Sequence, residues 1–178
     1  MVLSAPITYT FEQLGSGSLG GTPFTDAQVT LVLTGDTSTI VHPSATVYRN
    51  SGSATVTVAG LGTAAFNIPM RVFSNTNSSV LGAGISRVSD GRDLLAVLFV
   101  PGLSTYQLDT SIGPFTGTPG GNPSLAYSTT AGDFFLSTSN TPARLSTFTA
   151  TLGSEVPEPA SVGLVALGLG ALLLRRRR

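Results

Sequence analysis

The chain of 178 residues contains no cysteine, no lysine and no tryptophan, and only 10% of it is charged. Ordinary soluble proteins carry roughly 25% charged residues. Without cysteine the chain can form neither a disulfide framework nor a thiolate metal site, so its stability must come from a hydrophobic core. Residues 1–155 hold five Arg against six Asp and two Glu, a net charge of −3 with no basic cluster. This balance argues against a nucleic-acid partner.

Groups suited to catalysis are also scarce. The single histidine, His42, has neither a second histidine nor a cysteine with which to hold zinc, so we interpret it as a surface or strand-end residue. Residues 15–20 bring glycine and serine together in a loop, but without the strand-to-helix turn that exposes a hydrolase nucleophile. The pattern predicts a non-enzymatic protein with no cofactor.

The segment 90–93, Asp-Gly-Arg-Asp, is the one stretch that suggests a metal. Asp90 and Asp93 could lend two carboxylates to a calcium ion, which prefers oxygen ligands. The alternative is a turn in which Arg92 screens the carboxylates, and it is favoured because the full acidic loop signature is missing. We therefore predict no metal site, with Asp90 and Asp93 as weak candidates.

Most of the chain alternates between apolar and polar residues in short runs, which is typical of strands with one buried face. Residues 94–100 lack a polar break and predict a central strand buried on both faces. Glycine-rich residues 15–21 and 115–123 predict flexible loops, and no helix of ten residues is expected before the tail. The further expected strands are 7–11, 28–34, 39–49 interrupted at Pro43, 54–59, 64–73 interrupted at Pro69, 106–108, 133–136 and 146–152.

These strands predict an all-β fold in residues 1–154, an antiparallel β-sandwich or jelly-roll-like domain with turns rich in glycine, serine and aspartate. A chain of this length can bury roughly 70% of its unfolded surface in one core, so one domain is expected. Residues 155–178 form a separate tail.

The tail joins three elements in order. Pro157, Glu158 and Pro159 come first, an uncharged apolar run extends from Ala160 to Leu174, and the arginine cluster Arg175, Arg176, Arg177 and Arg178 ends the chain. As a helix the apolar run is roughly 22 Å long, against a hydrocarbon core of roughly 30 Å. Arginines that reach the head groups make such a short single transmembrane helix workable. The positive-inside rule places the arginine cluster in the cytoplasm and the preceding domain outside it.

This order of elements resembles PEP-CTERM, a carboxy-terminal sorting signal of exported proteins in Gram-negative bacteria that make exopolysaccharide. The resemblance implies that an exosortase, a membrane-embedded cysteine-dependent protease or transpeptidase, acts at Pro157, Glu158 and Pro159. The protein would then be held transiently in the inner membrane before reaching the cell surface or extracellular matrix. The alternative is an ordinary single-pass anchor. Residues 15–40 also resemble the opening of many exported domains that carry this tail, a likeness that transfers no active residue.

The start of the chain shows no export signal, because residues 1–5 have neither a basic start nor a long apolar stretch. Ser4, Ala5 and Pro6 instead look like the junction left after a small-residue cleavage site. We expect the true start to lie upstream, with non-classical export as the alternative.

The combined expectation is an exported surface or matrix protein of structural or adhesive type. About a quarter of the chain is Ser or Thr, which suits hydrogen bonding to exopolysaccharide but can equally reflect strand propensity. The alternative is a carbohydrate-binding module or a carbohydrate-active enzyme. An enzyme should gather two or more carboxylates in a concave site, whereas a matrix protein should scatter them over turns.

Overall fold

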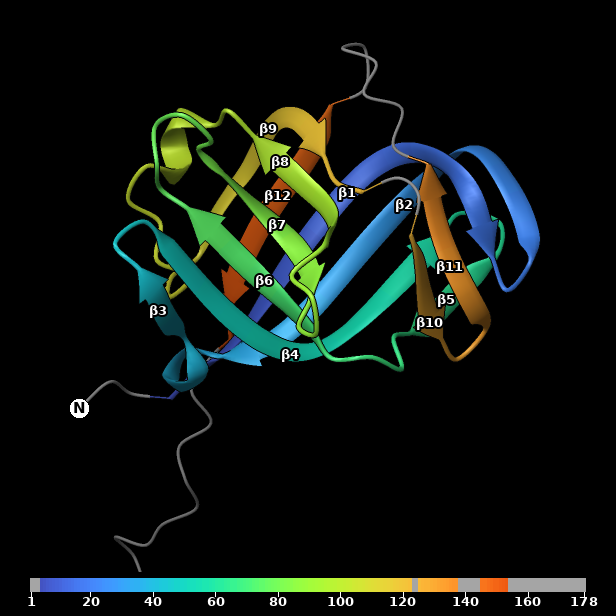
Figure 1. Cartoon of the computed structure of the whole chain (residues 1–178), viewed down its shortest axis with the longest axis horizontal. Helices are drawn as coiled ribbons and strands as arrows, with labels where there is room; N and C mark the ends of the chain where they lie inside the picture. Colours follow the sequence, from blue (N-terminus) through green and yellow to red (C-terminus); the bar gives the residue numbers. More distant parts are fainter. Residues whose placement is uncertain (1–3, 123–124, 138–144, 154–178) are drawn as a thin grey trace, which may run out of the picture.

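The computed structural model describes residues 4–122, 125–137 and 145–153, which are built almost entirely of strands (Figure 1). The helical segments within these ranges are two 3-10 turns, η1 (Thr37–Thr39) and η2 (Pro101–Leu103). The all-β prediction is therefore confirmed. The strands are β1 (Pro6–Leu19), β2 (Thr22–Asp36), β3 (Val41–Ser44), β4 (Val47–Val58), β5 (Gly62–Ala65), β6 (Met70–Asn75), β7 (Gly82–Arg87), β8 (Asp93–Leu98), β9 (Ile112–Gly120), β10 (Ala126–Thr129), β11 (Gly132–Ser137) and β12 (Ser146–Leu152).

The sheet closes on itself as an eight-stranded antiparallel barrel. Around the ring the order is β1, β12, β9, β8, β7, β6, β4 and β2, and β2 pairs back along the whole of β1 (Figure 1). The hairpin of β10 and β11 extends the sheet alongside the second half of β1, and β3 and β5 pair with β4. The predicted sandwich or jelly roll is therefore corrected to a closed barrel.

The sheet closes into a barrel because β4 and β9 each change the strand with which they hydrogen-bond partway along their length. β4 pairs with β6 up to Gly52 and with β2 from Ser53 onward, while β9 pairs with β12 up to Gly117 and then with β8. At both corners a Cβ would run into a neighbouring carbonyl oxygen, of Thr34 at Gly52 and of Leu98 at Gly117. Glycine at these points lets the strands bend, so the two expected layers join at both edges.

Three of the expected loops and strands are wrong. Residues 15–19 belong to β1 and residues 115–120 to β9, because pairing with neighbouring strands outweighs the weak strand preference of glycine. Residues 106–108 form no strand. Tyr106 and Leu108 are nevertheless buried, so the alternating apolar residues belong to a loop whose side chains pack into the core.

The predicted inward faces do form the core. Val29, Leu31, Leu33, Val56 and Val58 are fully buried, and the rings of Phe11 and Phe148 pack with centroids 4.8 Å apart. The far end of β12 departs from the prediction, since Leu152 is exposed. β8 is confirmed as a strand buried on both faces at residues 94–97, between β7 and β9. The predicted end at residue 100 is wrong, because the strand ends at Leu98 and Phe99 is exposed.

A buried polar network ties one end of the barrel together. Tyr9 Oη donates a hydrogen bond to the Leu108 carbonyl oxygen at 2.7 Å and accepts one from Asn50 Nδ2 at 2.9 Å. Asn50 Oδ1 accepts from Thr39 Oγ1 at 2.9 Å. Burial raises the pKa of Tyr9 well above its usual range, so the phenol stays a neutral donor. The network links β1, β4, η1 and the loop before β9.

The predicted tail lies outside the described residues, including the apolar segment and the arginine cluster. Within the ranges that the structure covers, no helix has the length and apolar character needed to cross a bilayer.

We predict that Asn50→Ala lowers the free energy of unfolding by about 2–3 kcal/mol, because it removes buried hydrogen bonds and leaves a small cavity. Tyr9→Phe should cost about 1–2 kcal/mol, since it removes only the hydroxyl. Urea unfolding measures both values. The control Thr55→Val, on the outer face of β4, should stay within about 0.5 kcal/mol of wild type. A loss that small for Asn50→Ala would contradict the network's role.

Candidate functional site

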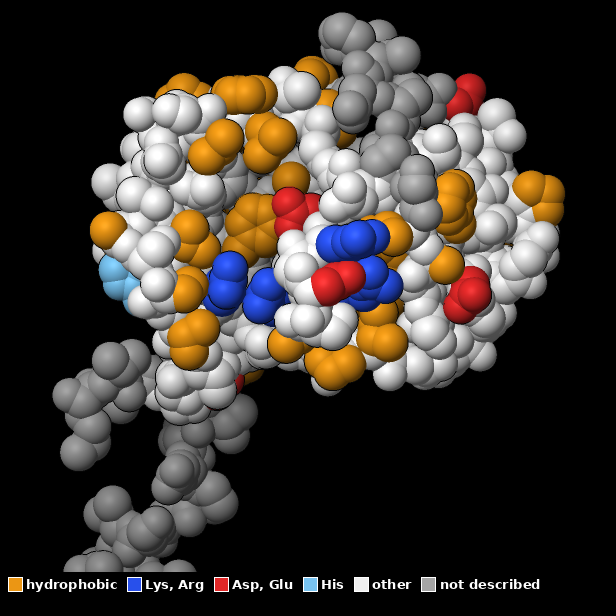
Figure 2. All heavy atoms as spheres, viewed as in Figure 1, with side chains coloured by type: hydrophobic (Ala, Val, Ile, Leu, Met, Phe, Trp, Pro, Cys, Tyr) orange, Lys and Arg blue, Asp and Glu red, His pale blue; other side chains and the backbone are white. Residues whose placement is uncertain are grey.

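The outer face of β4, β6, β7 and β8 carries a shallow cavity of about 180 Å³, which we call the arginine pocket. In the strand register Arg49 lies opposite Phe73, and Ser86 lies between Arg71 and Asp93. Because the chain has no lysine, the blue side chains gathered near the centre of Figure 2 are arginines, with red carboxylates beside them. The lining residues are Val47, Arg49, Arg71, Phe73, Asn75, Ser86, Gly91 and Asp93.

Phe73 supplies the apolar surface of the arginine pocket. Its partner in the register on β7 is Gly84, and a Cβ there would come within 2.5 Å of Phe73 Cζ. The missing side chain lets the ring lie down over β7 instead of filling the cavity. The pocket therefore combines a half-buried aromatic ring with charged walls.

The charges in the arginine pocket are unevenly matched. Burial, followed by the like charge of Arg49, lowers the pKa of Arg71, whose Nε donates to Ser86 Oγ at 3.2 Å. Burial also raises the pKa of Asp93 to about 6, in spite of the attraction of Arg71 and Arg49. Neither ion pair found among the described residues includes Asp93. Two cations therefore share one carboxylate that is only partly ionised near pH 6.

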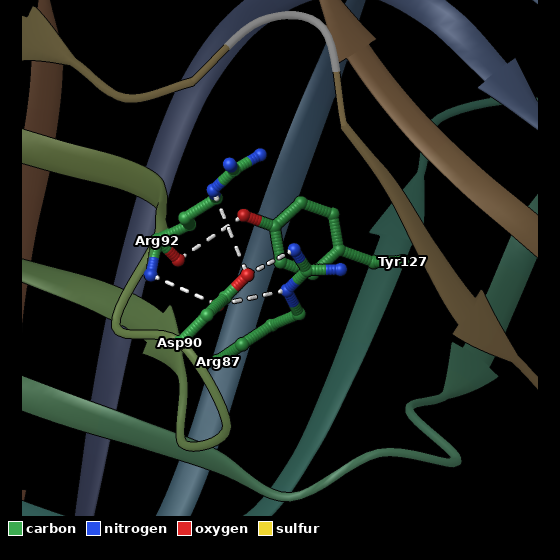
Figure 3. A network of polar contacts seen from close by, with 4 residues as sticks. All are labelled: Arg87, Asp90, Arg92 and Tyr127. Atoms are coloured by element: carbon green, nitrogen blue, oxygen red, sulfur yellow. Dashed lines mark hydrogen bonds and ion pairs between the residues drawn. The ribbon is translucent and has the colours of Figure 1, made fainter.

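The turn between β7 and β8 is held beside the pocket by a second polar network (Figure 3). Arg87 Nη2 lies 2.6 Å from Asp90 Oδ2, and Arg92 Nε lies 3.6 Å from the same oxygen. The hydrogen bond from Arg87 is the main reason why the pKa of Asp90 is lowered. Tyr127 Oη donates to the Arg92 carbonyl oxygen at 3.2 Å, and Arg87 Cζ lies 5.1 Å from the centre of the Tyr127 ring. These contacts anchor the turn to β10.

A second cavity, of about 280 Å³, lies where η1, β3, β4 and the loop before β9 meet. Tyr48 is on the inner face of β4, two residues before the buried Asn50, so the cavity opens at one end of the barrel and we call it the mouth groove. The exposed ring of His42 stacks on Tyr48 with centroids 4.2 Å apart and an interplanar angle of 4°. The lining residues are Thr37, Ser38, Ile40, His42, Tyr48, Gln107 and Asp109.

η1 is fixed at the edge of the mouth groove by Asp36, which caps it. Asp36 Oδ1 accepts hydrogen bonds from Ser38 N at 2.7 Å and from Ser38 Oγ at 2.6 Å. These bonds, with one from Ser4, lower the pKa of Asp36. The groove thus offers an aromatic face surrounded by hydroxyl, amide and carboxylate groups.

The structure separates the two weak metal candidates. Asp90 is engaged by the arginines of its own turn, and the expected screening by Arg92 is present, although Arg87 is the closer partner. Asp93 faces the arginine pocket instead. Across the described part of the chain, no three histidine, aspartate or glutamate side chains gather where they could hold a metal ion.

Neither cavity was predicted from the sequence. His42 lies at an exposed strand as predicted, but its stack on Tyr48 was not foreseen. The available signal for the arginine pocket was that Arg49 and Arg71 stand alone among uncharged neighbours in two strands. The sorting residues Pro157, Glu158 and Pro159 lie outside the described residues.

Comparison with known proteins identifies the tail. Residues 155–178 match the family model of the PEP-CTERM protein-sorting motif. The match confirms the predicted sorting signal and indicates an exported protein that is sorted at the membrane by an exosortase. Neither the curated proteins nor the solved structures yield a match to this chain.

We predict that Asp93→Asn stabilises the protein at neutral pH and has no effect in acid. Because the pKa of Asp93 is raised to about 6 on folding, the folded protein binds this proton more tightly, and stability falls as pH rises through about 6. The gain near pH 8 should be on the order of 1–2 kcal/mol after allowance for solvent screening. Thermal unfolding of both proteins between about pH 4 and pH 8 measures it.

Asp90→Asn is the matched control with the opposite sign. The lowered pKa of Asp90 means that this variant should lose stability at neutral pH and should match wild type only in acid. If the two variants changed in the same direction as pH rises, the assigned environments of Asp90 and Asp93 would be incorrect.

Proposed function

We propose that the chain is a non-enzymatic exported protein with a structural or adhesive role at the cell surface or in the extracellular matrix. The observation that carries this proposal is the match of residues 155–178 to the sorting motif. In this proposal the segment from Ala160 to Leu174 holds the protein transiently in the inner membrane, with the arginine cluster on the cytoplasmic side. Exosortase action at Pro157, Glu158 and Pro159 then releases the barrel from the inner membrane to the cell surface or extracellular matrix.

The outer face of β4, β2, β1 and β12 supports an adhesive role. The register aligns many of its hydroxyl side chains across neighbouring strands, which lie about 4.8 Å apart, and each is at least partly exposed. It also places the exposed carboxylate of Glu12 between Thr30 and Thr147. We call this array the threonine face. Its uncharged hydroxyl groups can hydrogen-bond to a polysaccharide without the salt sensitivity of ionic contacts. The members are Thr8, Thr10, Thr30, Thr34, Thr55, Thr57, Thr147, Thr149 and Thr151.

The distribution of carboxylates supports a role without catalysis. The arginine pocket contains one, from Asp93, and the mouth groove contains one, from Asp109. Asp36 and Asp90 are engaged in hydrogen bonds of their own turns. Hydrolysis of a glycosidic bond generally needs two carboxyl groups roughly 5–10 Å apart on either side of the bond. The arrangement in both cavities therefore favours binding or structure over hydrolysis of exopolysaccharide.

Export and processing can be tested together. We predict that the mature surface protein lacks Arg178, and that replacing Pro157, Glu158 and Pro159 with alanine leaves uncleaved protein at the inner membrane. Cell fractionation followed by mass spectrometry of the carboxy terminus measures both outcomes. The control Pro23→Ala, at an exposed position in β2, should be processed like wild type. Mature surface protein that retains Arg178 would contradict release from the membrane.

The mouth groove favours a second candidate function, binding of a neutral carbohydrate. Mouths of β-barrels are common ligand sites, and sugars often pack an apolar face on an aromatic ring while their hydroxyl groups bond to polar side chains. The stacked His42 and Tyr48 and the exposed Gln107 and Asp109 provide both kinds of group. Under this second hypothesis the chain is a carbohydrate-binding module.

We predict that the combined variant His42→Ala and Gln107→Ala weakens binding to immobilised neutral polysaccharide at least about tenfold, because both exposed contacts are lost. The full-length chain in detergent is compared with the variant in a pull-down titration. The combined variant Thr10→Val and Thr149→Val serves as control, because it removes hydroxyl groups of the threonine face and leaves the groove intact. If only this control lost binding, adhesion through the threonine face would be favoured over the groove.

A further inference from the structure

The arginine pocket holds an excess of positive charge that the rest of the domain does not use. Among the described residues, Arg87 and Arg92 each have a direct ionic partner in Asp90, which lies within 4 Å of both. Asp93 and, more weakly, Asp90 attract Arg71, and Asp93 also attracts Arg49, but neither of the ion pairs in the described part of the chain includes Arg49 or Arg71. Burial is the main cause of the lowered pKa of Arg71, and repulsion from the nearby Arg49 lowers it further, so holding the two cations together is unfavourable. An anion in the cavity would relieve that repulsion.

The donors are already oriented toward the cavity. Arg71 Nε is committed to Ser86 Oγ, which fixes the plane of the guanidinium and leaves its terminal nitrogens for a ligand. Gly91 keeps the space beside Arg71 open, since a Cβ there would lie 2.9 Å from Nη2. Asn75 Oδ1 accepts from Asn77 N at 3.0 Å, so its amide nitrogen remains a donor at the opposite wall.

We propose that the arginine pocket is a binding site for the carboxylate of an acidic sugar, with Arg49 and Arg71 holding the carboxylate and Phe73 contacting the apolar face of the ring. Guanidinium groups recognise planar carboxylates through paired hydrogen bonds, which matches the two arginines. A cavity of about 180 Å³ suits a single small group. The half-buried ring of Phe73 and the Asn75 amide favour a sugar over a bare anion, because they match a C–H face and a hydroxyl group. This site is separate from the mouth groove, and binding does not depend on the proposed export.

Asp93 makes the binding depend on pH. With a pKa of about 6, its carboxylate repels a second carboxylate at pH 8 and is largely protonated at pH 5. A uronic acid, with a pKa near the roughly 3.5 of an α-carboxyl group, stays ionised over this range, as do the arginines. β9 brings no titratable side chain to the site. The titratable and charged groups around Asp93 are Arg49 from β4, Arg71 from β6, Arg87 from the end of β7, Asp90 and Arg92 from the turn, and Tyr127 from β10.

Calorimetric titration of the full-length chain in detergent tests the proposal with galacturonate as the ligand. Galactose, which lacks the carboxylate, and acetate, which lacks the sugar ring, are the two control ligands. Galacturonate should bind more tightly than either, and roughly three- to tenfold more tightly at about pH 5 than at about pH 8. Equal affinity for galactose would overturn the role of the carboxylate. Equal affinity for acetate would overturn the assignment of a sugar, and absence of galacturonate binding at both pH values would overturn the site.

Variants locate the binding. Arg49→Gln and Arg71→Gln should each weaken galacturonate binding at least about tenfold, since each removes a charged hydrogen-bond donor. Arg92→Gln is the matched control, because Arg92 is exposed and lies outside the pocket lining, and it should bind like wild type. Asp93→Asn should bind tightly at both pH values. Unchanged binding by Arg71→Gln in a protein with a wild-type melting temperature, or a pH dependence retained by Asp93→Asn, would overturn the proposal.

Discussion

The closed barrel depends on two strands that bend and change their paired neighbour. β4 and β9 each pair with one neighbour and then with another, and Gly52 and Gly117 stand where the change occurs. Without a Cβ at these points the strands can approach a carbonyl oxygen that any larger residue would meet. The eight strands of the ring are consequently paired on both sides, and among the described strands only β3, β5 and β10, which lie outside the ring, pair on one side alone. A protein without cysteine thus closes its sheet by hydrogen bonding alone.

Closure divides the side chains into two populations. The inward set forms one apolar core, in which the polar groups of Asn50 and Tyr9 hydrogen-bond to each other. The outward set is largely uncharged, and the arginines of the described residues lie on β4, β6, β7 and the turn that leads into β8. The threonine face and the arginine pocket are formed by outward side chains, and the mouth groove lies at the end of the barrel where inward side chains such as Tyr48 become accessible. A weakly charged domain can therefore present a largely neutral hydroxyl surface and a local cationic site at once.

Much of this architecture could be predicted from local patterns. The alternation around Leu31, Val56 and Phe148 identified strands and their buried faces, and the apolar run at 94–97 identified a strand buried on both sides. The sorting tail was recognised from residues that are adjacent in the sequence. Closure was not predictable in this way, because it depends on which distant strands pair. The same holds for the arginine pocket, since Arg49, Arg71 and Asp93 come from three strands and only the register brings them together.

The central claim is that β4 and β9 close the barrel, and cross-strand nuclear Overhauser effects test it most directly. The account predicts contacts from β4 to both β2 and β6, and from β9 to both β12 and β8, in one set of spectra. Backbone amides on both sides of Gly52 and Gly117 should also be protected from hydrogen exchange. Missing contacts on one side of either strand, with rapid exchange of the amides there, would reveal an open sheet edge and contradict the account.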